Sequence, residues 1–278
     1  MTYQHTELST GNFFEGDVIK ASGPFPKKAA LTPPAKKRCT PAIAGVLAGF
    51  YTSHVKNLAV LGELELQETK DQARIDTLKD NNVHLKTIAQ DYASDVLLQD
   101  WKRRLPADTK RAFSFLGFAL KSGAQVINFR LGHEVAEAAL SAKKGPTDYL
   151  SALLRTVGIV DLVFVLELAS SDSGENHPLH LHGIARIPAA LAIQAIRKLL
   201  APEPDLAASP PTRGYRQRWS NKAIAVTELQ TPGTWVSYSG KEFDFTAHSL
   251  QSNPGYASRS ATTTGRELYA AIRVWLRP

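Results

Sequence analysis

Two apolar segments joined by a short polar stretch constrain the fold more than any other feature of this 278-residue chain. Residues 161–168 (Asp-Leu-Val-Phe-Val-Leu-Glu-Leu) are almost continuously apolar and have the length of a strand. Polar residues 170–176 follow, and then comes the segment 177–187 (His-Pro-Leu-His-Leu-His-Gly-Ile-Ala-Arg-Ile). Two strand-like runs this close in the sequence predict a hairpin of antiparallel strands.

The second of these strands carries two histidines in alternate positions. In an extended strand His180 and His182 project from one face, and Leu181 projects from the other. Two neutral imidazoles so placed are able to hold one divalent cation. A surface strand can also carry two histidines by chance. Other residues of the chain are therefore needed to distinguish a metal site from a chance pair.

The remaining patterns predict an α+β fold. Residues 125–131 and 223–229 read as further strands, and the order strand, helix, strand, strand, helix, strand is typical of an antiparallel sheet of ferredoxin or RNA-recognition type with helices on one face. The predicted helices lie at residues 106–123, 145–154, 188–200, 232–241 and 264–277.

The N-terminal third has a different composition. Residues 1–40 are polar, rich in Pro and Gly and basic at their end, which predicts a disordered tail. Residues 41–105 are helical in pattern and predict two helices, as a hairpin or a dimerising coil, with a break near residues 80–82. We therefore expect three parts: tail 1–40, helical region 41–105 and a main domain 106–278.

Composition excludes several classes of site. Cys39 is the only cysteine, so the chain can form no internal disulfide and no zinc site of several thiolates. The net charge of +7 suits a polyanionic partner. No apolar run reaches membrane-spanning length, and we expect a soluble intracellular protein without a membrane partner.

One carboxylate lies near the predicted histidine pair. Glu167 stands at the end of the first apolar strand, where pairing would bring it within reach of both imidazoles. A His, His, Glu set with open coordination positions suits Mg²⁺ or Mn²⁺ acting as a Lewis acid on phosphate. Glu175 is a competing third ligand, but it lies in the loop, and His177 has the wrong alternation for the pair.

Tyr238 and Lys241 are the candidate catalytic residues. They are three positions apart, so on a helix they share a face. A tyrosine hydroxyl is a poor nucleophile unless a cation stabilises the phenolate and the phosphate oxygens, and Lys241 would supply that charge. A Tyr-x-x-Lys sequence alone is common; its combination with the histidine pair and the upstream glutamate is much rarer.

This combination resembles the HUH endonuclease superfamily, and specifically the replication initiators (Rep proteins) of bacterial plasmids and integrated mobile elements. The resemblance spans about residues 110–275 and is carried by His-Leu-His-Gly at 180–183 and Trp-Val-Ser-Tyr-Ser-Gly-Lys at 235–241. The strand 126–131 stands in place of the first family motif and matches it least well. We assign no chemistry to its Asn128 and Arg130.

The resemblance implies a site-specific endonuclease and strand transferase that nicks single-stranded DNA at a replication origin to start rolling-circle replication. Tyr238 would form a 5′-phosphotyrosine link and leave a free 3′-hydroxyl, with the metal held by His180, His182 and Glu167. The chain carries no G-x-x-x-x-G-K-[ST] motif, so a host helicase and polymerase would act in trans. Residues 41–105 are where we expect copies to associate, if the protein is an oligomer.

Further residues are candidates for tracking the DNA strand, and two other functions compete. A cluster of cations with one aromatic side chain would contact phosphates and bases. A single-tyrosine HUH transposase shares the motif order, and a non-catalytic DNA-binding regulator could keep the fold. A cupin-type enzyme is excluded, because Arg186 and Ile187 stand where its carboxylate should follow. The DNA-binding candidates are Arg213, Arg216, Arg218, Trp219 and Lys222.

Overall fold

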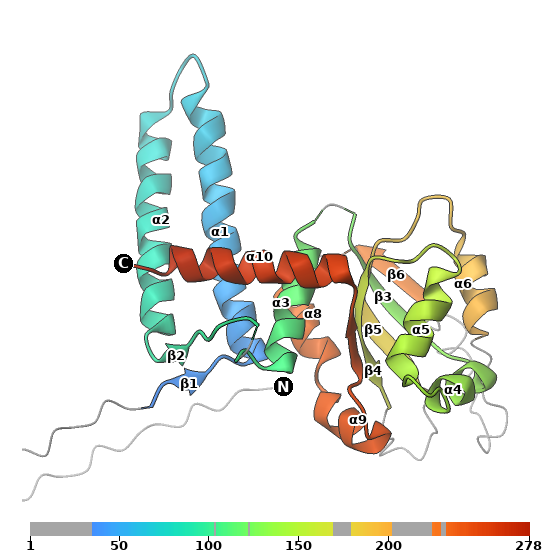
Figure 1. Ribbon diagram of the computed structural model, residues 1–278. Coiled ribbons are helices and arrows are strands. Elements are labelled where there is room, and N and C mark those ends of the chain that lie inside the picture. Colours follow the sequence, from blue (N-terminus) through green and yellow to red (C-terminus); the bar gives the residue numbers. More distant parts are fainter. Residues whose placement is uncertain (1–34, 103, 122, 169–178, 202–223, 229–231) are drawn as a thin grey trace, which may run out of the picture. The chain divides into compact units, whose positions relative to one another are not determined.

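The computed structural model describes residues 35–102, 104–121, 123–168, 179–201, 224–228 and 232–278. Residues 36–278 form one compact unit. This unit is an α+β structure with a five-stranded antiparallel sheet (Figure 1). The expected tail ends earlier than residue 40, because β1 (Lys37–Arg38) pairs in parallel with β2 (Val96–Leu97).

Two long helices follow the first short strand and pack against each other as a hairpin. Helix α1 (Pro41–Glu65) begins at Thr40, whose hydroxyl accepts a hydrogen bond from the Ile43 N–H. Helix α2 (Gln72–Ala93) begins at Asp71, whose carboxylate caps the Arg74 N–H. The predicted break near residues 80–82 is wrong. The turn lies at residues 66–71, where the caps are, and α2 continues through residues 80–82.

The sheet has the strand order β6-β3-β5-β4-β7, and each neighbouring pair is antiparallel. The expected hairpin is confirmed, since β4 (Leu162–Glu167) pairs with β5 (His180–Ala185). The histidine strand β5 is therefore central, between β4 and β3 (Gln125–Arg130). The edges are β6 (Ile224–Glu228) and β7 (Gly255–Ala257), and β7 had not been predicted.

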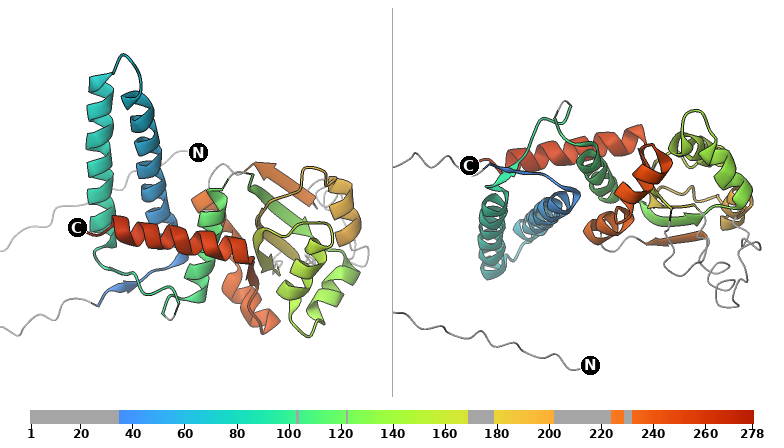
Figure 2. Two further views of the ribbon diagram at one scale, coloured as in Figure 1. Left: turned by 45° about the horizontal axis from the view of Figure 1, so that its top comes forward. Right: turned by 90° about the horizontal axis from the view of Figure 1, so that it is seen from below.

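Helices cover both faces of the sheet, and the expectation that they lie on one face is wrong (Figures 1 and 2). Val163 and Ile184 pack with α1, α3 (Ala107–Ala119) and α10 (Arg259–Trp275). Phe164 and Leu181, on the other face, pack with α4 (His133–Leu140), α5 (Pro146–Arg155) and α6 (Ile193–Leu200). All six residues of β4 are buried, as an unbroken apolar strand requires when both its faces are covered.

Helices α3 and α10 cross at a pair of glycines. A Cβ at Gly117 of α3 would lie 2.5 Å from the Thr264 carbonyl oxygen, and one at Gly265 of α10 would lie 2.4 Å from Ser114 Cα. The two backbones therefore touch, which explains a glycine in the middle of a helix. Helix α8 (Pro232–Ser239) lies beside α1 and α3, and α9 (Phe243–Leu250) follows it.

Candidate metal centre

The pairing of β4 with β5 brings three potential metal ligands together. Glu167 lies directly opposite His180 in the ladder, and His182 is two residues further along β5. Directly paired residues project from the same face of a sheet, so all three side chains lie on the face covered by α3, α8 and α10. The sequence predicted this grouping from the alternation of the strands and their order.

The ligand atoms are close and largely shielded from solvent. Glu167 Oε2 lies 2.7 Å from His182 Nε2 and 3.4 Å from His180 Nε2. The side chains of His180, His182 and Glu167 are 13%, 3% and 7% exposed. One ligand atom from each residue can be chosen so that all lie within 4.8 Å of one another.

The protonation of this group favours metal binding. Burial alone would raise the pKa of Glu167, but the two imidazoles that face it outweigh burial and hold that pKa well below its ordinary value of 4.5. Burial also lowers the pKa of His182, against the opposing influence of Glu167. The site therefore presents a carboxylate and a neutral buried imidazole, which is the state in which these groups bind metals.

The three residues fit a small divalent cation. Both ring nitrogens of His182 are buried without an assigned hydrogen bond to any described residue, although Nε2 lies 2.7 Å from Glu167 Oε2. Ligand atoms held at about 2.1 Å from a metal in octahedral geometry lie about 3 Å apart. The distances from Glu167 Oε2 to the two imidazole nitrogens, 2.7 Å and 3.4 Å, are close to this value. A set of two imidazoles and one carboxylate leaves several coordination positions open for water or substrate.

An aromatic pair on α8 covers the histidines. The Trp235 indole donates a hydrogen bond of 2.9 Å to the Gly183 carbonyl, which fixes α8 above β5. The Tyr238 ring stacks on Trp235 with its centroid 5.0 Å away and meets the His182 ring edge-on at 5.2 Å. Tyr238 remains 42% exposed. The tyrosine thus stands next to the candidate metal ligands and is open to a substrate.

Lys241 lies near Tyr238, as predicted, but it does so from the turn after α8 and not from a shared helix face. Helix α8 ends at Ser239, and Lys241 follows in a turn closed by a 3.2 Å hydrogen bond from its N–H to the Tyr238 carbonyl. The Lys241 ammonium lies 3.1 Å from Glu167 Oε1 and 4.7 Å above the Tyr238 ring. Partial burial would lower its pKa, but Glu167 outweighs that effect and raises it, so Lys241 is charged.

Strand β3 adds a polar side chain that the sequence analysis set aside. Asn128 lies opposite His182 in the ladder, and its Oδ1 is buried without a hydrogen bond. Arg130 lies opposite His180 on the same face. Alternation along residues 125–131 was the signal that could have placed Asn128 and Arg130 beside the histidines.

Several predicted residues lie outside the described residues. These are the DNA-binding candidates Arg213, Arg216, Arg218, Trp219 and Lys222, and also Glu175 and His177. The structure therefore leaves their roles as predictions.

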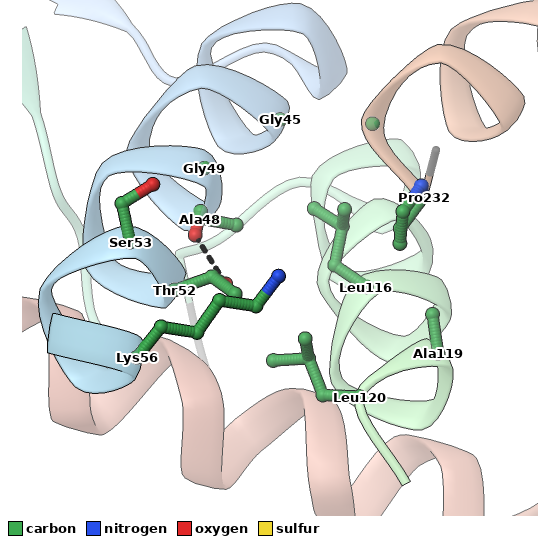
Figure 3. Close-up of a pocket in the computed structure, with 11 residues that line it drawn as sticks. Gly45, Ala48, Gly49, Thr52, Ser53, Lys56, Leu116, Ala119, Leu120 and Pro232 are labelled. Carbon is green, nitrogen blue, oxygen red and sulfur yellow. Dashed lines mark hydrogen bonds between the residues drawn. The ribbon is translucent and has the colours of Figure 1, made fainter. Parts of the chain in front are cut away.

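A separate cavity of about 390 Å³ lies between α1, α3 and the first turn of α8 (Figure 3). Small residues of α1, including Gly45, Ala48 and Gly49, form one wall, and the Lys56 amine extends over the opening. The Thr52 hydroxyl is already bound to the Ala48 carbonyl. None of the three candidate metal ligands lines this cavity.

Comparison with models of known protein families, with curated proteins and with solved structures gave no match. Within the described part of the chain, no helix combines the length and the apolar composition needed to cross a membrane. The arguments for a function therefore rest on the site itself.

Proposed function

We propose that this protein is a metal-dependent single-stranded DNA endonuclease and strand transferase of the HUH type, acting as an initiator of rolling-circle replication. The observation that supports this most is the meeting of Glu167, His180 and His182 with Tyr238 on one face of the sheet. The central position of the histidine strand in a five-stranded antiparallel sheet agrees with this proposal.

His180, His182 and Glu167 would hold the metal, Mg²⁺ or Mn²⁺, which would supply Lewis-acid polarisation of the scissile phosphate. Tyr238 attacks the phosphorus through its hydroxyl oxygen, which loses its proton. A phosphotyrosine bond forms at the 5′ side, and the bond to the 3′-oxygen breaks. The 3′-oxygen takes up a proton and leaves as a free hydroxyl, so the number of phosphodiester bonds is conserved.

Lys241 has two roles in this reaction. Its ammonium lies 4.7 Å above the Tyr238 ring, where its positive charge would stabilise the negative charge that develops on the reacting oxygens. Its contact with Glu167 ties the turn after α8 to the end of β4, which keeps the tyrosine close to the ligands. A host helicase and polymerase acting in trans would then extend the free 3′-hydroxyl.

The decisive experiment is a search for a covalent protein–DNA adduct. A mixed-sequence library of 3′-labelled single strands is incubated with the protein and Mn²⁺, and denaturing gels report label that migrates with the protein. We expect an adduct with the wild-type chain, none with Tyr238→Phe and none after chelation. Tyr92→Phe is the matched control, because Tyr92 is similarly exposed, at 39%, but lies on α2.

The same gels separate the competing functions. DNA binding without any adduct would contradict the proposal and favour a non-catalytic regulator. Joining of hairpin ends in preference to simple nicking would favour a single-tyrosine transposase. An adduct that persists in Tyr238→Phe would show that another residue is the nucleophile.

A further inference from the structure

Arg111 of α3 carries a guanidinium that is enclosed between α9 and β7. Its Cζ lies 3.7 Å from the centroid of the Phe243 ring, so the guanidinium stacks on that ring. On the β7 side, a Cβ at Gly255 would lie 2.8 Å from Arg111 Cδ and 3.0 Å from Nη1. The absence of a side chain at Gly255 is therefore what allows the arginine to lie across the strand.

This guanidinium lacks an anionic partner in the described part of the chain. Among the described residues, none forms a hydrogen bond with the buried Nη1 and none forms an ion pair with Arg111. Burial lowers the pKa of Arg111 to about 10, although Asp108 and Asp244 oppose that effect from a distance. Asp108 is already paired with Arg38 at 2.7 Å. A desolvated cation without a partner costs free energy that a bound anion would recover.

The space beside Arg111 suits an anion of the size of a phosphate group. A pocket of about 180 Å³ opens there, and Lys110, Ser114 and Asn253 also line it. The Lys110 ammonium makes a long 3.4 Å contact with the Lys102 carbonyl. Two cations line the pocket together with neutral polar and apolar residues, and its lining contains no carboxylate among the described residues.

The pocket lies on the same face of the sheet as the candidate metal centre. Gly255 pairs with Val165, which pairs with His182 across β4. With strands about 4.8 Å apart, Gly255 is about 10 Å from His182, within reach of nearby phosphates of one DNA strand. The turn after α8 joins the two places, since Lys241 contacts Glu167 and Phe243 stacks on Arg111.

We propose that Arg111, assisted by Lys110, binds a backbone phosphate of the single strand whose scissile phosphate lies at the metal centre. This inference rests on the proposed function. The phosphate contact carries no base information; it sets the register of the strand, so that one phosphodiester is presented to Tyr238. Arg111 is thus a positioning residue.

The test measures DNA binding without catalysis. A short fluorescent single strand of mixed sequence is titrated with protein in EDTA at several salt concentrations, and anisotropy gives Kd. We expect Arg111→Met to weaken binding several-fold and to reduce the slope of log Kd against log salt by about 0.7, the value for one phosphate contact on a single strand. Lys110→Gln should lower affinity and slope in the same direction, and it tests the pocket if Arg111→Met does not fold.

Arg155→Met is the matched control, because it removes the same charge from an exposed position on α5, on the opposite face of the sheet. It should leave both affinity and slope close to those of the wild type. Unchanged slopes in both pocket variants, with adduct formation intact in the wild type, would overturn this inference and leave the proposed function standing. Failure of the wild type to form any adduct would overturn the proposed function itself.

Discussion

At the residue scale, Glu167 holds its negative charge against burial because three side chains surround its two oxygens. His180 and His182 face one oxygen, and Lys241 faces the other. The pKa of Glu167 in the folded chain is therefore below its ordinary value of 4.5. As the pH falls below that value, the unfolded chain takes up a proton that the folded chain does not, so the free energy of unfolding decreases.

The Glu167→Gln variant should lack this part of the acid sensitivity. We expect the free energy of unfolding of the wild type to fall more steeply between about pH 5 and pH 3, by up to about 1.4 kcal/mol per pH unit for one proton. Urea denaturation at a series of pH values, with EDTA present, measures both slopes. Parallel curves for the two proteins would show that Glu167 titrates normally in the folded chain.

Cys39 offers a second test at this scale, because it reports packing far from the metal centre. The side chain is 1% exposed, and burial, aided by the charge of Asp108, raises the pKa of its thiol to about 11. The thiolate is the reactive form, so alkylation at about pH 8 should be at least about 100-fold slower in the folded chain than in urea. Mass spectrometry of iodoacetamide-treated protein measures both rates. Comparable rates would mean that the segment from β1 into α1 does not pack as described.

The sequence predicted that the three candidate metal ligands lie together, but not the setting of the tyrosine. His180, His182 and Glu167 follow from strand alternation within one hairpin, which is a local rule. The positions of Trp235 and Lys241 depend on how α8 docks over β5 and where it ends, and docking is decided by contacts between distant segments. Asn128 was assigned no chemistry because residues 126–131 match the first family motif least well; its place beside His182 became clear only from the pairing of β3 with β5.

At the scale of elements, β7 was missed because three residues are too few to show a period, and the short helices α4 and α9 were missed as well. The two-sided covering of the sheet was missed because the helices on each face come from separate parts of the chain. The unbroken apolar character of residues 162–166 was the available signal, since a strand exposed on one face alternates. The turn between α1 and α2 was misplaced because residues 80–82 have the polar composition of a helix break. The residue that marks the start of α2 is its N-cap, Asp71.

The helical glycines fall into two classes, those with open space beside them and those in contact with another backbone. Substitution by alanine should have opposite effects on stability in the two classes. In α1, a Cβ at Gly49 would meet nothing within 4 Å, so Gly49→Ala should stabilise the fold by about 0.5–1 kcal/mol through helix propensity. In α10, a Cβ at Gly265 would collide with the Ser114 backbone, so Gly265→Ala should destabilise it by about 1–3 kcal/mol. Urea midpoints measure both effects. Equal effects of the two substitutions would contradict the close crossing of α3 and α10.

At the scale of the whole molecule, the helical hairpin has two parts with different packing. The first turns of α1, with Ala44, Leu47 and Ala48, belong to the core that includes α3 and α10. The distal part has a small cluster of its own, in which Leu61, Leu64 and Ile75 are buried. Removing the distal part should therefore leave the rest of the fold, including the candidate metal centre, in place.

A variant in which a short glycine-containing turn replaces residues 60–78 tests this division. We expect its thermal midpoint to stay within about 3 °C of the wild type, because the main core loses no buried residue. Its yield of Tyr238 adduct should equal that of the wild type, because the candidate ligands lie on β4 and β5, whereas the deleted segment holds a separate cluster. Size-exclusion chromatography of the same pair tests the expected association through residues 41–105: if the wild type is an oligomer held by the distal hairpin, the trimmed chain elutes as a monomer. Loss of the adduct in a folded, trimmed chain would contradict the independence of the two parts and assign the hairpin a direct role in presenting DNA.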